Sequence, residues 1–206
     1  MLSLGERGKI ARRSRVDDRD ERQSHESSQA VVPLLHLDMN PHAPTIDSFD
    51  TTISARDWLA RPHAPSDLGI GGAMLIRMHT VRDTRGLLTA GEIGDGLPFT
   101  PRRYFVISRV PSKDVRGAHA HRKLRQLLVC LAGSVVVEAC DGNRSVEVTL
   151  DSPQAGLYIP PLVWGAQHHY SGDAVLLVLA SREYDATDYI RDFDEFLALR
   201  RTGVSA

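Results

Sequence analysis

The chain has 206 residues, of which 42% are hydrophobic and 25% are charged, and its formal net charge is -1. These values are typical of globular proteins, and the balanced charge indicates neither nucleic acid nor an anionic membrane as a partner. No stretch approaches the roughly 20 apolar residues that a membrane-spanning helix needs, and the basic first residues lack the apolar run of a secretory signal. We therefore expect a cytoplasmic protein whose two cysteines, Cys130 and Cys140, are small buried residues rather than a disulfide.

Residues 1–72 are predicted to form a largely disordered extension. Residues 12–26 are a mixed-charge run with almost no large apolar residue, a composition that cannot offset the entropy cost of ordering. Prolines recur between residues 33 and 65 and interrupt longer elements. One short helix is expected at 54–60, with Ser54 as its N-cap and Trp58 among its apolar contacts. Met39 is an alternative first residue.

Residues 73–200 are predicted to form one all-β domain. Short runs rich in β-branched and aromatic residues are divided by glycine and proline at spacings of about ten residues. The pair Asp141-Gly142 favours a tight hairpin. This pattern indicates a sandwich or barrel rather than a parallel α/β sheet. The expected strands are 74–79, 103–110, 127–131, 134–140, 145–150, 156–160 and 174–180.

The domain is expected to end in a helix that begins with Asp188 as its N-cap. Tyr189, Ile190 and Phe193 would then lie on one apolar face at helical spacing, together with two apolar residues of the following turn. Such a face predicts that the helix packs across the outside of the barrel.

The residues with the clearest chemical potential are His119 and His121. Residues two apart in a strand face the same side, so both imidazoles would project together into the barrel. Gly117 permits a bulge just before them, and Arg116 adds a positive charge suited to a phosphate or a developing oxyanion. Histidine is the side chain best matched to proton transfer at physiological pH. The pattern therefore predicts acid/base catalysis next to a carbonyl group.

The spacing from His119 to Gln126 and Gly133 resembles the first motif of the cupin superfamily, in which His, His and Glu bind a metal. Gln126 stands in the position of the glutamate, and a neutral amide is a poorer ligand for a divalent cation than a carboxylate. Gly165 and His168 keep only a fragment of the second motif. We therefore expect a site without metal.

A collinear series of motifs resembles the dTDP-sugar 3,4-ketoisomerases of the cupin superfamily, the WxcM-like C-terminal domains. The resemblance implies a jelly-roll barrel that moves the keto group of dTDP-4-keto-6-deoxyglucose from carbon 4 to carbon 3 in deoxyamino-sugar biosynthesis. It also implies no metal or organic cofactor, and a homodimer with exchanged N-terminal strands. The matching stretches are Asp83-Thr84-Arg85-Gly86, Pro98-Phe99, Arg116-Gly117, His119-Ala120-His121, Gln126-Leu127, Gly156-Leu157-Tyr158, Val163-Trp164, Tyr184-Asp185 and Asp188-Tyr189-Ile190-Arg191.

The resemblance implies roles for individual residues. His121 would be the base that moves a proton between sugar carbons 3 and 4 through an enediol, and His119 would move the hydroxyl proton. Arg116 would polarise the keto oxygen or hold the pyrophosphate. The residues expected to bind substrate are Gln126, Arg85, Arg103, Tyr158 and Trp164, the last two as walls of the cavity.

The sequence departs from the family pattern in two places, and three other functions stay open. Gly165 follows Trp164 without a side chain, and Phe105 and Val106 occupy positions where relatives often carry another aromatic residue; Tyr104 is expected to face the opposite side. The alternatives are a sugar 3,5-epimerase, a metal-dependent cupin enzyme and a non-catalytic sugar-nucleotide-binding cupin.

Overall fold

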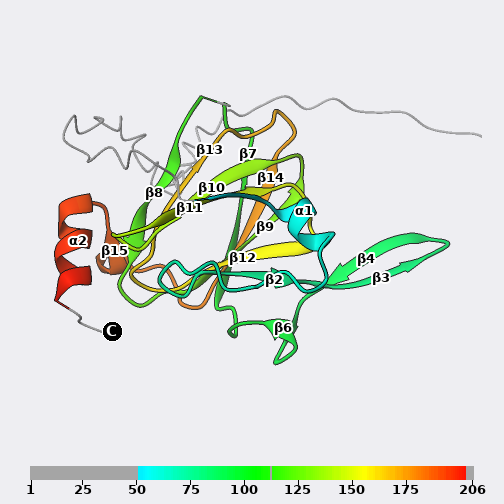
Figure 1. Cartoon of the computed structure of the whole chain (residues 1–206), viewed down its shortest axis with the longest axis horizontal. Coiled ribbons are helices and arrows are strands. Elements are labelled where there is room, and N and C mark those ends of the chain that lie inside the picture. Colours follow the sequence, from blue (N-terminus) through cyan, green and yellow to red (C-terminus); the bar gives the residue numbers. More distant parts are fainter. Residues whose placement is uncertain (1–50, 112, 203–206) are drawn as a thin grey trace, which may run out of the picture. The chain divides into compact units, whose positions relative to one another are not determined.

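Two packed β-sheets build the domain in the computed structural model, which describes residues 51–111 and 113–202 (Figure 1). The first sheet, in spatial order, contains β1 (Thr52–Ser54), β11 (Ser145–Leu150), β10 (Val135–Cys140), β13 (Trp164–His168), β8 (Arg116–His121) and β15 (Tyr189–Ile190). The second contains β2 (Met74–Arg77), β12 (Ala155–Ile159), β9 (Gln126–Ala132), β14 (Val175–Ala180) and β7 (Arg103–Ser108). The predicted all-β class is confirmed.

The core lies between the two sheets and follows the alternation of each strand. Val135 and Val137 of β10 face Leu128 of β9 across the interior, and all three side chains are buried. Cys130 and Cys140 are buried and unpaired, as expected. The predicted tight turn joins β10 to β11: the Asp141 carboxylate accepts hydrogen bonds from the backbone N–H groups of Asn143 and Arg144, both at 2.9 Å. The hydrophobic pattern therefore predicted β2, β7, β9, β10, β11, β12 and β14, whereas β13 and β15 of the six-stranded sheet were not among the expected strands.

The segment before residue 72 is more ordered than the sequence indicated. The strand β1 pairs in parallel with β11, and the helix α1 (Ala55–Leu59) follows it with the predicted N-cap, in which Ser54 Oγ accepts from the Asp57 N–H at 3.2 Å. Trp58 is buried in the core and donates from its indole nitrogen to the Pro65 carbonyl at 2.9 Å. The expected disorder is therefore wrong for residues 51–72, and residues 1–50 lie outside the described residues.

Replacing Ser54 with alanine tests whether this segment contributes to the fold. The substitution removes the hydroxyl that caps α1, so the free energy of unfolding should fall by about 1 kcal/mol. Urea unfolding followed by tryptophan fluorescence measures the change. The control Thr84→Ala, at an exposed position, should shift stability by less than about 0.5 kcal/mol. Equal stability of the Ser54→Ala variant and the parent would contradict an integral role for this segment.

A two-stranded hairpin extends away from the barrel (Figure 1). It consists of β3 (His79–Asp83) and β4 (Gly86–Ala90), which pair only with each other among the described strands. The short strands β5 (Glu92–Ile93) and β6 (Gly96–Leu97) follow it. Val81, Leu87 and Leu88 are exposed on the hairpin, Leu88 at 63% of its surface. We refer to residues 79–90 as the hairpin arm.

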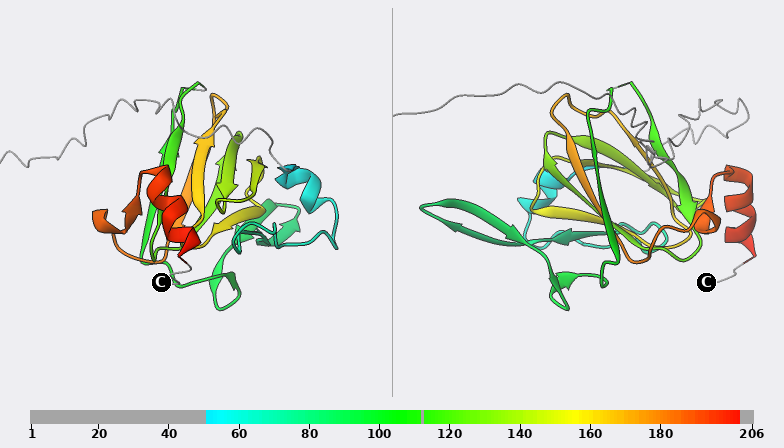
Figure 2. Two further views of the ribbon diagram at one scale, coloured as in Figure 1. Left: turned by 60° about the vertical axis from the view of Figure 1, so that its left-hand side comes forward. Right: turned by 180° about the vertical axis from the view of Figure 1, so that it is seen from behind.

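The C-terminal segment differs from its prediction in one respect. Asp188 belongs to a short 3-10 turn (Ala186–Asp188), and the next two residues form β15, which pairs with β8. The helix α2 (Phe193–Arg201) begins later, with Asp192 as its N-cap accepting from the Glu195 N–H at 2.8 Å. It packs on the outside of the six-stranded sheet, as predicted (Figure 2). Among the described residues, no helix combines the length and hydrophobicity needed to cross a bilayer.

Candidate active site

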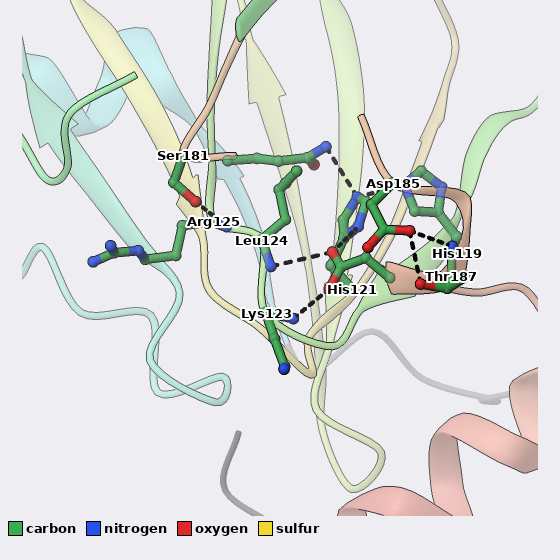
Figure 3. Close-up of polar contacts among 10 residues, drawn as sticks. His119, His121, Lys123, Leu124, Arg125, Ser181, Asp185 and Thr187 are labelled. Carbon is green, nitrogen blue, oxygen red and sulfur yellow. Dashed lines mark hydrogen bonds and ion pairs between the residues drawn. The ribbon is translucent and has the colours of Figure 1, made fainter. Parts of the chain in front are cut away.

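His119 and His121 of β8 face the interior of the barrel side by side (Figure 3). Their Nε2 atoms are 3.0 Å apart, and the two rings meet edge to face at 4.7 Å between centroids. Ala120 between them faces the opposite way and packs in the cluster beneath α2. His121 is only 5% exposed. The strand alternation that the sequence indicated therefore brings both imidazoles to one buried wall.

Gly117 allows β8 to bend just before the histidines. Its φ of +65° lies in the left-handed region, and a Cβ at this position would come within 2.7 Å of the Gln167 side-chain nitrogen. The pairing of β8 with β13 shifts register in the same place, between Gly165 and Gln167. Only glycine fits such a conformation without strain. The bend at this residue determines which of the following side chains in β8 point into the barrel.

Asp188 is a buried partner of His121 that sequence reasoning missed. One carboxylate oxygen lies 3.0 Å from His121 Nδ1, and the side chain is 7% exposed. The same carboxylate accepts from the backbone N–H groups of Lys123 at 2.8 Å and Leu124 at 3.2 Å (Figure 3). These contacts span more than 60 residues of sequence, and the sequence contained no periodic signal for them.

Gln126, the first residue of β9, lies on the other side of His121. Its side-chain nitrogen is 3.3 Å from His121 Nε2, and the side chain is buried. The amide group can donate to an unprotonated ring nitrogen, whereas a carboxylate in this place could only accept. The predicted substrate-binding residue therefore lies next to the predicted base.

Tyr189 packs against the imidazole pair, and Tyr184 and two arginines lie around Tyr189 and His121. The Tyr189 ring lies 4.4 Å from the His121 ring and 4.8 Å from the His119 ring, and Arg191 stacks over Tyr189 at 4.6 Å. Arg103 lies 5.3 Å over the Tyr184 ring. Tyr184, Tyr189 and Arg191 were matched to the family in sequence, but none was predicted to be a site residue.

The guanidinium of Arg103 has unused hydrogen-bonding capacity. Within the part of the chain that the structure describes, its buried Nε and Nη2 atoms have no hydrogen-bond partner. A buried donor without a partner costs about 1–3 kcal/mol. An anionic ligand that accepts from both atoms would remove this cost, so Arg103 is suited to bind an oxyanion or a phosphate.

Burial keeps both imidazoles neutral at physiological pH. It lowers the pKa of His119 to about 3, and the charges of His121 and Arg191 add to that effect. Burial also lowers the pKa of His121 to about 4, against the opposing influence of Asp188, while Arg103 and Arg191 lower it further. Both imidazoles are therefore in the unprotonated form near pH 7, which is the form that can accept a proton from a substrate.

The pH dependence of turnover follows from these pKa values. Because the base must be unprotonated, kcat/KM should stay level from about pH 8 to below about pH 6 and decline only toward pH 4. An unperturbed histidine would begin to lose activity near its pKa of about 6.5. Initial rates measured over this pH range, with an assay whose detection step does not depend on pH, provide the test. An acid limb at about pH 6.5 would contradict neutral histidines in the free protein.

Stability is expected to fall in the same pH window, so folding must be monitored during that measurement. The histidines are neutral in the folded chain and titrate near pH 6.5 when unfolded. The unfolded chain therefore binds more protons below about pH 6.5, and stability is lost as the pH falls from there toward about 4. Near-UV circular dichroism of each sample separates unfolding from protonation of the base.

Two predicted cavity-wall residues lie elsewhere. The Trp164 ring packs on Phe193 at 5.0 Å, on the outer face of the six-stranded sheet, where α2 covers it. Tyr158 lies with Phe99, 6.3 Å away, in a cluster outside the main core. Its neighbours Leu157 and Ile159 point into that core, so strand alternation turns Tyr158 outward. The structure does not bring either ring to the imidazole pair.

Two predicted arginines are also distant from the histidines. Arg116 is exposed, and its charge acts on Tyr170. Burial raises the pKa of Tyr170 to about 12, and the positive charge of Arg116 opposes that rise. Arg85 lies at the tip of the hairpin arm, 89% exposed, and pairs with Asp83 in the same turn. Within one chain, the positive charges beside the histidines come from Arg103 and Arg191 instead.

The residues present do not fit the metal site of the cupin pattern. His168, the remnant of the second motif, pairs in register with Val136 on the outer side of β10 and lies 3.5 Å from Glu147. The histidine pair therefore lacks both the fourth ligand and the carboxylate that Gln126 replaces. Across residues 51–111 and 113–202, no three His, Cys, Asp or Glu side chains are grouped to hold an ion.

The structure also places the aromatic residues of β7. Tyr104 is 71% exposed and Phe105 packs against the core, so the two face opposite sides, as predicted. The phenol of Tyr104 is thus directed away from the interior. Among the described residues, the tyrosine whose ring contacts both imidazoles is Tyr189.

The chain resembles known proteins along this same region. The family model described as WxcM-like, C-terminal, matches residues 72–201. A curated relative from Aneurinibacillus thermoaerophilus, TDP-4-oxo-6-deoxy-alpha-D-glucose-3,4-oxoisomerase, is 48% identical over 122 residues. This alignment covers 59% of the present chain and 88% of the relative.

Solved structures show the same likeness. A mutant of the 3,4-ketoisomerase QdtA from Thermoanaerobacterium thermosaccharolyticum, in complex with TDP-4-keto-6-deoxyglucose, has 36% identity and a TM-score of 0.63 over 66% of this chain and 99% of that chain. The TDP-quinovose 3,4-ketoisomerase WlaRB from Campylobacter jejuni has 39% identity and a TM-score of 0.60 over 63% and 99%. The predicted cupin-type barrel is confirmed. The chain belongs to the WxcM-like C-terminal family, as the resemblance of its motifs predicted.

Proposed function

We propose that this protein is a TDP-sugar 3,4-ketoisomerase that moves the keto group of dTDP-4-keto-6-deoxyglucose from carbon 4 to carbon 3. The observation that carries the proposal is the neutral imidazole pair, with a buried His121 and Nε2 atoms 3.0 Å apart beside Gln126 and Arg103. Relatives that share the barrel are named for this reaction. The expected enzyme class, an isomerase, agrees with these names.

The reaction needs two proton movements and no net oxidation. The His121 imidazole removes the proton from carbon 3, and the carbonyl electrons move onto the carbon 4 oxygen to give an enediol. The proton on His121 exchanges with solvent, and its delivery to carbon 4 leaves the carbonyl at carbon 3. His119 carries the hydroxyl proton from one oxygen to the other. Each step uses a general base or acid of the kind that histidine supplies. Histidine, glutamine and arginine side chains suffice for this route, so we propose it proceeds without metal.

Arg103 and Gln126 are proposed to hold the substrate during these steps. The two unpaired guanidinium nitrogens of Arg103 match the negative charge that develops on the sugar oxygens or the charge of the diphosphate. The Gln126 amide can donate to a sugar oxygen next to His121. The product carries a keto group at carbon 3, which is the substrate chemistry of an aminotransferase, and we therefore propose a role in deoxyamino-sugar biosynthesis. The proposed location is the cytoplasm.

Incubation with the TDP-linked 4-keto sugar in deuterated water tests the reaction directly. Ketoisomerisation predicts a 3-keto product with deuterium at carbon 4, whereas a 3,5-epimerase would retain the 4-keto group and label carbons 3 and 5. Protein treated with EDTA should keep its full rate. Loss of activity with the chelator would favour a metal-dependent enzyme, and thermal stabilisation by TDP without turnover would favour a binding module.

We also propose that the protein is a homodimer in which the hairpin arms are exchanged. An isolated two-stranded hairpin is marginally stable in water, and the apolar side chains of the arm are exposed in one chain. In the dimer, Arg85 at the tip of the arm would reach the partner's substrate. Light scattering after gel filtration should give a dimer for the parent, a monomer for Leu88→Asp and a dimer for the control Val115→Asp. A monomeric parent would contradict the exchange.

A further inference from the structure

Asp188 forms every contact of its carboxylate within the buried site. One oxygen faces His121 Nδ1 at 3.0 Å and the Leu124 N–H at 3.2 Å, and the other accepts from the Lys123 N–H at 2.8 Å. Its backbone carbonyl also accepts from the Arg122 N–H at 2.9 Å. Backbone N–H groups of the single segment 122–124 thus fix Asp188 and its carboxylate against the ring. Such a fixed acceptor can control where the ring carries its hydrogen.

The contacts of His121 select one of its two neutral tautomers. A neutral imidazole carries one N–H, and a carboxylate can only accept. The hydrogen on Nδ1 donates to Asp188, and the lone pair on Nε2 then faces the Gln126 side-chain nitrogen, which can donate to it. The opposite tautomer would direct a lone pair at the carboxylate and a hydrogen at the N–H of the Gln126 amide. The geometry therefore favours an Nδ1–H tautomer with a basic Nε2.

The Asp188 carboxylate also offsets the positive charge that forms on His121 when the ring accepts a proton. The cations Arg103 and Arg191 oppose a positive charge on the ring, as does His119 when protonated, and the ring of Tyr189 packs against it. Asp188 is the one carboxylate among the described residues within hydrogen-bonding distance of the ring. It compensates the imidazolium charge that forms when the base accepts a proton.

We propose that Asp188 is a positioning residue that holds His121 in the Nδ1–H tautomer, so that Nε2 is the nitrogen that takes the substrate proton. This inference rests on the proposed ketoisomerase function for its kinetic consequence. The tautomer itself is a property of the free protein and can be measured without substrate. Asp188 acts through His121 and needs no contact with the sugar.

The substitution Asp188→Asn tests the proposal because the amide keeps an acceptor for backbone and adds a donor beside Nδ1. The amide N–H should direct the ring hydrogen to Nε2 and remove the base. We expect kcat to fall about 100- to 10,000-fold, with KM changed less than about threefold. The matched control is Asp185→Asn, which alters a carboxylate of the same turn that accepts from Thr187 and does not touch the histidines. This control should keep the parental kcat and the Nδ1–H tautomer of His121.

Nitrogen chemical shifts of the imidazole in ¹⁵N-histidine-labelled protein provide the second readout. The parent should show His121 protonated at Nδ1, and the Asp188→Asn variant should show it protonated at Nε2. A parent ring protonated at Nε2 overturns the proposal even if the variant fails to fold. A folded variant with parental kcat overturns it as well. An inactive parent with the expected tautomer would instead refute the proposed function and leave the positioning of the ring supported.

Discussion

Replacing His121 with asparagine should lower kcat about 100- to 10,000-fold while the protein stays folded and still binds TDP. The substitution removes the base, which is the group that general acid/base catalysis requires. The asparagine amide can still donate to Asp188 from nearly the position of the ring Nδ1, so the buried carboxylate keeps its partner. Turnover of the 4-keto sugar and calorimetric titration with TDP measure the two effects separately.

The control for this experiment is His63→Asn, at an exposed position outside the barrel interior. This variant should match the parent in rate and affinity. Parental turnover by the His121→Asn variant would show that another residue removes the proton. Loss of TDP binding together with turnover would show that the ring acts mainly in building the pocket.

Replacing Arg103 with methionine should separate binding from stability. The substitution removes buried guanidinium nitrogens that have no partner in the free protein, so stability should stay unchanged or rise by about 1 kcal/mol. TDP or the keto sugar should bind about 10- to 100-fold more weakly, because a charge-assisted hydrogen bond is lost. Thermal unfolding without ligand measures the stability, and calorimetric titration with TDP measures the affinity.

Arg102→Met is the matched control, because the neighbouring side chain is exposed and the change in net charge is the same. It should leave TDP affinity within about twofold of the parent value. Weaker binding by both variants to the same extent would indicate general electrostatic attraction rather than a specific contact. A marked loss of stability in Arg103→Met would contradict the view that this side chain is held in place for a ligand.

The part of the site that lies on one strand could be predicted from the sequence. His119 and His121 share a face because strand residues two apart always do, and Gln126 begins the next core strand. Asp188 could not be found in this way, because its contact with His121 depends on how the C-terminal segment returns to β8. Its position before an apolar run instead resembled a helix cap.

The predicted site residues that lie away from the imidazole pair have a common physical cause in strands that are covered on both faces. Tyr158 lies between two core residues, and Trp164 lies beneath α2, so apolar neighbours surround each one and do not reveal its side. Arg116 precedes the bulge at Gly117, where the regular alternation is interrupted. Residues 51–72 fold because Trp58 is buried against the barrel, a tertiary contact that local composition does not encode.

The central claim is that His121 Nε2 is the base for carbons 3 and 4 of the sugar, and a crystal structure of the His121→Asn variant with the TDP-linked 4-keto sugar tests it most directly. The account predicts that the side chain at position 121 lies within about 3.5 Å of carbon 3 or carbon 4, with Arg103 on an anionic oxygen. A sugar ring bound out of reach of that side chain, or bound to an ion held between His119 and Gln126, would contradict it.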